Sequence, residues 1–220
     1  MAEFVTLTAS DGHKFQAWWA PPQGKPRAGL VVIQEIFGVN SHIRDVTERF
    51  AREGYLAVAP AMFDRVQRGV DIGYTPDDVA KGRELMGKMD WDKSVLDVEA
   101  ARASVASLGS VGITGFCYGG SVAWVAAARL KFAAAVAYYG GAIAKFAKEK
   151  PQCPIICHWG KQDQNIPMSM VDEVKAAQPQ VPMFLYDAGH GFACDQRGSF
   201  NEAARDEAWQ RTLTHFKKFL

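Results

Sequence analysis

The sequence predicts an α/β fold in which helices flank both faces of a mostly parallel central sheet. Short runs of apolar and β-branched residues alternate with longer segments of helical period. Runs such as Leu30-Val31-Val32-Ile33 are apolar throughout, which suits strands that are covered on both faces. With 220 residues, 48% of them hydrophobic, the chain has enough apolar surface for one core. We therefore expect a single domain over residues 1–220.

The expected strands are short apolar segments, and longer helical segments lie between them. The strands cover residues 5–8, 15–20, 29–34, 55–59, 111–114, 133–139, 155–159 and 183–187. The helices cover residues 42–52, 76–89, 93–108, 118–129, 168–177 and 200–218. Asp11-Gly12 predicts a hairpin turn between the first two strands. Helix starts are indicated by Thr75-Pro76-Asp77-Asp78 and by the capping-box spacing of Ser199-Phe200-Asn201-Glu202.

Charge and hydropathy argue against binding to nucleic acid and against a position on or in a membrane. Lys and Arg total 25 against 24 Asp and Glu, so there is no broad basic field to hold nucleic acid or an anionic membrane. No apolar run reaches the roughly 20 residues of a bilayer span. The start Met1-Ala2-Glu3 lacks the basic region of a signal peptide. We therefore expect a cytoplasmic protein with free thiols at Cys117, Cys153, Cys157 and Cys194.

The segment Gly115-Phe116-Cys117-Tyr118-Gly119 carries the most chemical information. It joins an expected strand to an expected helix and has the form of a nucleophile elbow. The central residue of such a turn takes strained backbone angles, and glycines two positions away on either side avoid a collision. The helix N-terminus favours a thiolate at this position, which would make Cys117 a nucleophile. Buried cysteine is also a common small apolar residue, so the motif alone leaves a packing role open.

A nucleophile elbow needs a base and an acid that orients the base, in the order nucleophile, acid, histidine. Asp163 follows the expected strand 155–159, and His190 follows the expected strand 183–187 between two glycines. Each alone could be an ordinary loop residue. Three strand-end positions in the required order predict a catalytic set. The other histidines are interpreted as structural, with His42 at the start of a surface helix, His158 inside a strand, His13 in a turn and His215 on the last helix.

Further candidates follow the expected strand 29–34, in Gln34-Glu35-Ile36-Phe37-Gly38. In an elbow fold the loop after this strand supplies an oxyanion-hole N–H, so the Ile36 amide would complement the Tyr118 amide. Glu35 would then lie near the thiol of Cys117 and could share its proton. The alternative is a solvent-facing glutamate at the start of a loop. The aperiodic segment 61–74 is long for a loop and is expected to border the active site.

Taken together, these motifs resemble the dienelactone hydrolase family, a cysteine-based branch of the α/β-hydrolases. The resemblance covers nearly the whole chain. Besides the Cys117 elbow, it rests on Asp11-Gly12, Gln34-Glu35-Ile36-Phe37-Gly38-Val39-Asn40, Gly54-Tyr55, Asp97-Val98-Glu99-Ala100, Tyr138-Tyr139-Gly140 and Gly189-His190-Gly191-Phe192.

The resemblance implies an α/β-hydrolase fold and a role for each site residue. It implies that Cys117 is the nucleophile, His190 the base, Asp163 its orienter, Glu35 the acid that holds the resting thiol, and the Ile36 and Tyr118 amides the oxyanion hole. Family members hydrolyse cyclic enol-lactones through an acyl-enzyme, the carboxymethylenebutenolidase reaction of chloroaromatic degradation. They use neither a metal nor an organic cofactor. The resemblance therefore implies a hydrolase of small lactones or esters.

The sequence departs from the family pattern where the family binds the substrate carboxylate. One family arginine stands four residues after the histidine, a place occupied here by Cys194, whose role stays open. The place of the other arginine falls at Val79. The candidate substrate-binding residues are therefore Lys81, Arg83, Arg197, Phe37 and Tyr139, although the basic ones could equally be ordinary surface charges.

Two other functions stay open. The same triad would suit a broad carboxylesterase or thioesterase. A different class is a non-catalytic ligand sensor that uses the thiol of Cys117. Zinc is disfavoured because Cys153 and Cys157 have no matching Cys or His pair, so neither a metal nor a cofactor is expected. Both a monomer and a small homo-oligomer are compatible with the sequence.

Overall fold

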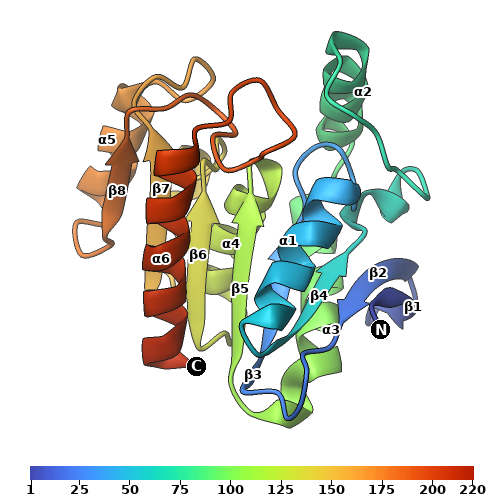
Figure 1. The fold of residues 1–220 in the computed structure, drawn as a ribbon. Helices are drawn as coiled ribbons and strands as arrows, with labels where there is room; N and C mark the ends of the chain where they lie inside the picture. The colour runs from blue at the N-terminus through green and yellow to red at the C-terminus, as the bar shows by residue number, and fades with distance from the viewer. The chain divides into compact units, whose positions relative to one another are not determined.

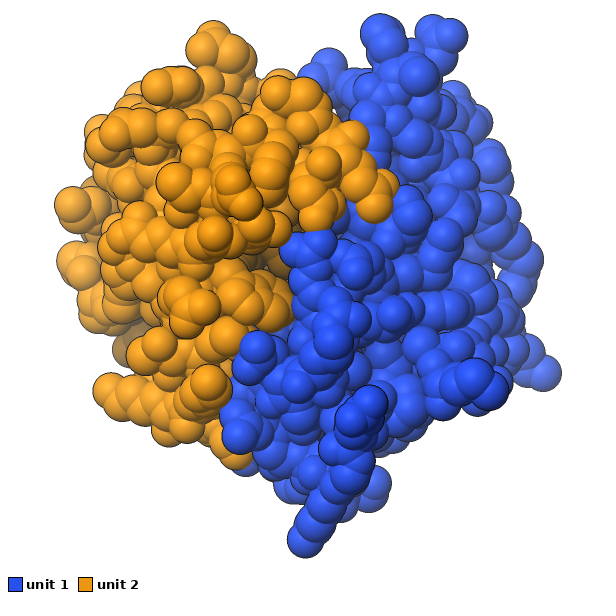
Figure 2. All heavy atoms as spheres, in the orientation of Figure 1, with its two compact units in different colours: residues 1–113 blue, residues 114–220 orange.

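The computed structural model describes all 220 residues. The chain divides into two compact units, Met1–Ile113 and Thr114–Leu220, which Figure 2 colours blue and orange. Strands and helices alternate in both units, and the strands are mostly parallel, which confirms the predicted α/β class (Figure 1). The single-domain assignment stays a prediction.

In the first unit the strands take the order β1-β2-β4-β3. They are β1 (Glu3–Thr8), β2 (Lys14–Ala20), β3 (Ala28–Ile33) and β4 (Tyr55–Pro60). The antiparallel pairing of β1 with β2 confirms the hairpin around Asp11-Gly12. β4 pairs antiparallel with β2 and parallel with β3. Helix α1 (Ser41–Arg52) covers one face, and α3 (Trp91–Val105) covers the other (Figure 1).

Local sequence explains how the helices of this unit begin. The side chain of Asn40 caps α1 by accepting the N–H of Ile43 at 3.2 Å. Helix α2 (Pro76–Gly87) starts at a capping box in which the Thr75 hydroxyl and the Asp78 carboxylate accept each other's backbone N–H, as the sequence predicts. The segment 61–74 contains a short 3₁₀ helix, Met62–Arg65.

In the second unit the strand order is β5-β6-β7-β8. β5 (Val111–Phe116) starts in the first unit and ends in the second, followed by β6 (Ala134–Tyr138), β7 (Ile155–Gly160) and β8 (Met183–Tyr186). β6 pairs parallel with β7, and β7 pairs parallel with β8. Helices α4 (Tyr118–Arg129) and α5 (Met168–Ala177) lie behind these strands in Figure 1, and α6 (Glu202–Phe219) lies in front. Parallel pairing places the loops after β6, β7 and β8 at one edge.

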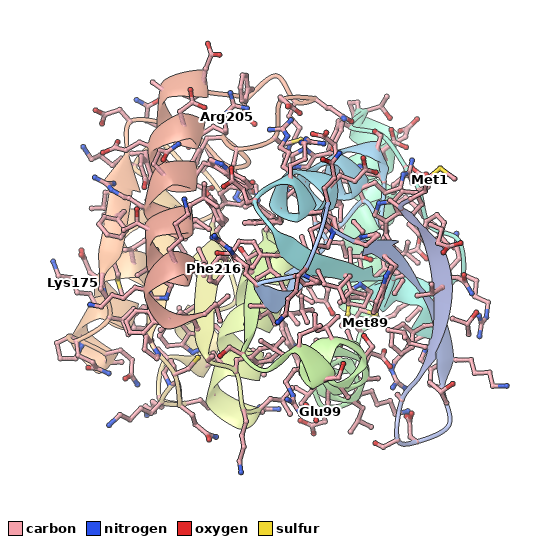
Figure 3. The ribbon with its side chains drawn as sticks, turned by 60° about the horizontal axis from the view of Figure 1, so that its bottom comes forward. Met1, Met89, Glu99, Lys175, Arg205 and Phe216 are labelled. Atoms are coloured by element: carbon pink, nitrogen blue, oxygen red, sulfur yellow. The ribbon has the colours of Figure 1, made fainter.

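The core of each unit follows from the apolar runs in its strands. Every residue of β3, β4, β5, β6 and β7 is buried, as expected for strands covered on both faces. On α6, Phe216 is fully buried, and Figure 3 shows it near the end of the helix, with Arg205 near the start. No helix combines the length and apolar character that crossing a membrane requires. The cytoplasmic location stays a prediction.

Two local predictions are wrong. The cap of α6 is Asn201 and not Ser199, because the Asn201 carboxamide oxygen accepts the N–H of Ala204 at 3.0 Å. His42 is fully buried, although it was expected on a surface helix. It stands beside Ile43 on the apolar stripe of α1, which continues one turn later at Val46 and faces the strands.

Arg65 binds Asp11 and Asp97, two acidic residues that belong to the sequence motifs quoted above. Its guanidinium donates from Nε to Asp97 Oδ2 at 2.6 Å and from Nη2 to Asp97 Oδ1 at 2.7 Å. It also donates from Nη1 to Asp11 Oδ2 at 2.8 Å. This Arg65 cluster (Asp11, Arg65 and Asp97) ties the β1–β2 turn to α3. Asp11 and Asp97 therefore have a structural role, in which each fixes its own segment to Arg65.

Candidate active site

Cys117 stands at the turn between β5 and α4, in the second unit. Its backbone has φ 56° and ψ −115°, a left-handed conformation that is unusual for a residue with a side chain. A Cβ at position 115 would lie 2.0 Å from the carbonyl oxygen of Gly119, so only glycine fits there. The Cys117 N–H donates to the carbonyl of Tyr138 at 3.1 Å, which ties the turn to the end of β6. The thiol is held at a strained and fixed position.

His190 lies between Cys117 and Asp163. Its Nε2 is 3.1 Å from Cys117 Sγ, and its Nδ1 is 2.7 Å from Asp163 Oδ2. All three residues come from loops or turns that follow strands of the second unit. The structure therefore brings together the nucleophile, base and acid candidates that the sequence singles out.

Asp163 is oriented by its own backbone neighbours. Its Oδ1 accepts the N–H groups of Asn165 at 2.8 Å and Ile166 at 3.1 Å, which leaves Oδ2 for His190. Its side chain is 1% exposed. A buried carboxylate with this geometry fixes the tautomer of the imidazole, with the proton on Nδ1 and Nε2 aimed at the sulfur.

The ionisation of His190 reflects competing effects. Burial of the ring favours its neutral form, but the charge of the Cys117 thiolate and the hydrogen bond to Asp163 outweigh burial and raise the pKa of His190 to about 10. The ring therefore stays protonated at neutral pH when the thiolate is formed.

Tyr139 packs against the imidazole, and Arg197 lies against the residue that follows His190. Tyr139 has φ 37°, and its ring packs edge-on against His190 with 5.2 Å between centroids. Gly191 has φ 76°, and a Cβ there would lie 2.4 Å from Nη1 of Arg197. The guanidinium thus rests on the residue that follows His190. Cys194, fully buried, donates its N–H to the Gly191 carbonyl at 3.0 Å.

A buried hydrogen-bond chain supports the strands under this site. Arg211 donates to the Tyr186 hydroxyl at 3.0 Å, and this hydroxyl is hydrogen-bonded to His158 Nδ1 at 2.8 Å. His158 Nε2 is hydrogen-bonded to Thr212 Oγ1 at 3.2 Å, and this oxygen lies 2.6 Å from the Tyr138 hydroxyl. Burial and the Arg211 charge lower the pKa of His158 to about 3, which keeps the ring neutral as the chain requires.

The remaining candidates belong to the first unit. Glu35, Ile36 and Phe37 follow β3 and are all buried. Helix α2 packs against this segment through Gly82, where a Cβ would lie 2.4 Å from the Ile36 carbonyl oxygen. Lys81 and Arg83 flank that glycine. Arg83 is exposed, and Lys81 forms an exposed ion pair with Glu84 at 3.3 Å.

The sequence profile of the Dienelactone hydrolase family matches residues 15–220. The chain belongs to the dienelactone hydrolase family. A Synechocystis protein that carries the provisional name carboxymethylenebutenolidase is 38% identical over 208 residues, which cover 86% of this chain and 85% of that protein. The carboxymethylenebutenolidase of Pseudomonas putida is 32% identical over 226 residues, which cover 97% of this chain and 95% of that protein. This dienelactone hydrolase family member is therefore a carboxymethylenebutenolidase-like hydrolase.

Solved structures agree with this assignment. A crystal structure from Klebsiella pneumoniae, provisionally described as a dienelactone hydrolase, matches with a TM-score of 0.85 and 30% sequence identity. The match covers 99% of this chain and all of that chain (100%). The α/β-hydrolase fold that the sequence predicts is thereby confirmed.

The sequence alone did not identify two features of the site. The left-handed backbone at Tyr139 and the chain through His158 depend on contacts between segments far apart in the sequence. The one available signal was the glycine pair after Tyr139, because glycines often flank a strained turn.

Proposed function

We propose that the protein hydrolyses a cyclic enol-lactone or a small carboxylic ester through an acyl-enzyme on Cys117. The observation that carries this proposal is the hydrogen-bonded line from Cys117 through His190 to Asp163 at a strained elbow. Membership of a family whose Pseudomonas putida relative is named carboxymethylenebutenolidase supports the substrate class.

In the first half-reaction the Cys117 thiolate attacks the lactone carbonyl carbon. The carbonyl electron pair moves to oxygen, where the Tyr118 N–H at the start of α4 stabilises it. We assign the second donor to the Ile36 amide. Collapse of this intermediate breaks the ring C–O bond, and His190 donates its proton to the leaving oxygen. The product stays attached as a thioester.

In the second half-reaction a water molecule hydrolyses the thioester. Neutral His190 takes a proton from the water while the hydroxide attacks the acyl carbon. Asp163 stabilises the imidazolium that forms. The tetrahedral intermediate then expels the Cys117 thiolate as its leaving group, which releases the carboxylic acid. The thiolate is again beside the imidazolium of His190.

We assign Glu35 to control of the resting thiol. A buried carboxylate that competes with His190 for the Cys117 proton would lower the thiolate fraction before substrate binds. Its complete burial in the first unit supports a role other than a surface charge, because glutamate is almost always exposed in folded proteins. This control would limit oxidation of the thiol in the absence of substrate.

We assign substrate binding first to Arg197 and Tyr139, since Tyr139 packs against His190 and Arg197 lies against Gly191, the next residue. Arg197 would bind a carboxylate group of the substrate. Phe37, Lys81 and Arg83 are secondary candidates. Lys81 is the weakest of these because Glu84 already pairs with it at an exposed position.

The test is a panel of enol-lactones, carboxylic esters and thioesters with intact-mass detection of an acyl adduct. The proposal expects turnover of a lactone or ester and an adduct that maps to Cys117. Cys153→Ala is the matched control, because it removes a thiol outside the triad. Preference for thioesters would favour the thioesterase alternative, and turnover of many unrelated esters would favour the broad carboxylesterase. Absence of turnover together with reversible oxidation of Cys117 would favour the sensor.

A further inference from the structure

The second unit contains a pocket at the opposite end of its strands from the triad. The pocket has a volume of about 670 Å³ and is lined by the start of β7, the segment before β8, the loop 150–154 and one side of α6. β7 runs from this pocket, at Ile155, toward the loop that carries Asp163. Six strand residues span roughly 16 Å, so the pocket is separate from Cys117 and His190.

The walls of the pocket are mainly apolar and rigid. Three prolines and two aromatic rings contribute to them, and these residues lose little conformational freedom when a ligand binds. They are Pro151, Pro154, Pro182, Phe184 and Phe219. The volume lies within the range of roughly 300–1,000 Å³ that small-molecule sites occupy.

The charged residues around the pocket are mostly basic. Lys150, Arg211 and Lys218 line it, and Glu207 is the acidic residue among the lining side chains. Glu207 is neutralised by Arg211, with 2.5 Å between Oε1 and Nη2. The pocket therefore has a positive excess that comes from the two lysines.

Arg211 is also held in place as part of the wall. Its guanidinium carbon lies 4.3 Å from the centroid of the Phe184 ring, and Nη1 donates to the Tyr186 hydroxyl at 3.0 Å. A guanidinium fixed by stacking and hydrogen bonding presents a flat surface on which an aromatic ring can stack. His215 adds no charge at neutral pH, because burial lowers its pKa.

We propose that this pocket binds a small aromatic anion, with the ring system against the proline and phenylalanine walls and the anionic group near Lys150 and Lys218. Apolar walls supply the affinity, and the two lysines supply the preference for negative charge. This site does not depend on the proposed hydrolysis, because none of its lining residues belongs to the triad. Binding is measured without turnover, so the two proposals can fail separately.

The test uses two fluorescent probes with one ring system. Anilinonaphthalene sulfonate carries an anionic group, and phenylnaphthylamine lacks it. We expect the sulfonate to bind the full-length protein at least tenfold more tightly than the neutral probe. Lys218→Glu should remove most of this preference by reversing a charge at the pocket. Lys217→Glu, at the exposed neighbouring position that does not line the pocket, is the matched control and should leave it unchanged.

Filling the pocket with a larger side chain tests whether the sulfonate probe binds there. Thr214 and Gln210 are exposed residues of α6 that line the pocket, so Thr214→Trp or Gln210→Trp should fill it without disturbing the core. Either variant should weaken the sulfonate at least tenfold while circular dichroism stays that of the wild type. Unchanged binding in both folded variants would overturn the proposal, as would equal affinity for the two probes. A dimer that either tryptophan variant dissociates, with no probe bound to the wild type, would assign this face to a second copy instead.

Discussion

Two charged clusters, one in each unit, have similar parts and different roles. The Arg65 cluster holds two carboxylates with one guanidinium, and the candidate active site holds a carboxylate, an imidazole and a thiol. Both contain short hydrogen bonds, and both include residues of the motifs that carry the resemblance to the family. Short distances and burial alone therefore do not separate a structural cluster from a catalytic one.

The difference lies in what each cluster leaves available for reaction. In the Arg65 cluster, both oxygens of Asp97 accept from the guanidinium, and the Asp97 side chain is 1% exposed. In the site, Cys117 is partly exposed and has a strained backbone. Strain that persists in a folded protein is maintained by the surrounding contacts and is common at functional sites. An accessible reactive atom on a strained turn distinguishes the catalytic candidate.

The largest expected effect is that of Cys117→Ala. Because the acyl-enzyme cannot form without the thiol, kcat should fall by at least about 100,000-fold. The melting temperature should stay close to that of the wild type, since the change is small and the position is not part of a strand. Steady-state hydrolysis together with a thermal melt checks both. Near-normal turnover would place the chemistry elsewhere.

Asp163→Asn should have the next largest effect. The amide keeps the size of the side chain but no longer favours the tautomer that presents Nε2 to the sulfur, so kcat should fall by roughly 1,000- to 10,000-fold. The matched control is Asp187→Asn, because Asp187 lies in the same group of loops and pairs with Lys161 at an exposed position. A loss of activity in the control similar to that of Asp163→Asn would contradict the assignment.

Arg65→Met should reduce stability rather than chemistry. Removing the guanidinium leaves the Asp97 carboxylate buried without its partner, and broken buried pairs cost about 3–5 kcal/mol. Urea unfolding should show this loss, while kcat of the folded protein stays within about twofold. Arg102→Met is the matched control, because Arg102 pairs with the more exposed Glu99 and should change stability by less than about 1 kcal/mol. A large fall in kcat with unchanged stability would reverse the roles of the two clusters.

These effects also show which features the sequence could predict. All eight strands and all six α-helices were predicted, because continuous apolar runs and helical periods are local signals. The sequence places the start of α6 too early. The Asn201 N–H donates to the Phe192 carbonyl, and the residues around Asn201 do not reveal this contact with a more distant loop. The burial of His42 was missed for a similar reason, since a histidine within an apolar stripe gives no sign of its surroundings.

For the site, chain order was informative because the elbow architecture requires it. Cys117, Asp163 and His190 were singled out as residues that follow strands, and parallel strands end at one edge. The strained backbone of Tyr139 was not predicted, because it depends on packing against His190 and Phe192. The structural role of Asp97 could not be separated from a functional one until Arg65 was located.

The rate at which Cys117 is alkylated tests whether the proton between Cys117 and His190 lies on the sulfur or on the imidazole. Because the pKa of His190 is raised to about 10, its imidazolium form persists through neutral pH and is lost as the pH rises through about 10. If the Cys117 proton has already moved to this ring, the alkylation rate by iodoacetamide should change little between about pH 7 and 9, whereas an ordinary thiol gains about tenfold per unit. His190→Gln should restore the ordinary slope.

The variant Glu35→Gln distinguishes the proposed effect of Glu35 on the Cys117 thiol from the effect of His190. If the Glu35 carboxylate lowers the thiolate fraction, wild-type alkylation is slow at pH 7, and the variant should react about tenfold faster. Rapid alkylation of the wild type, or an unchanged rate in Glu35→Gln, would leave the reactivity of Cys117 to His190 and Asp163 alone.

The smallest expected effect concerns the substrate carboxylate. Arg197 rests on Gly191 beside His190, but it is partly exposed, so a charged hydrogen bond from it should contribute about 1 kcal/mol, below the value for a buried one. Arg197→Ala should therefore lower kcat/KM for a lactone acid roughly fivefold and leave its methyl ester unchanged. Arg83→Ala tests the other exposed candidate in the same way, and Arg205→Ala on α6 is the control, because Arg205 pairs with Asp206 and lies outside the His190 loop. With Cys194 in place of a family arginine, the wild type should prefer the acid only weakly over the ester. A strong preference that survives both Arg197→Ala and Arg83→Ala would show that another group binds the carboxylate.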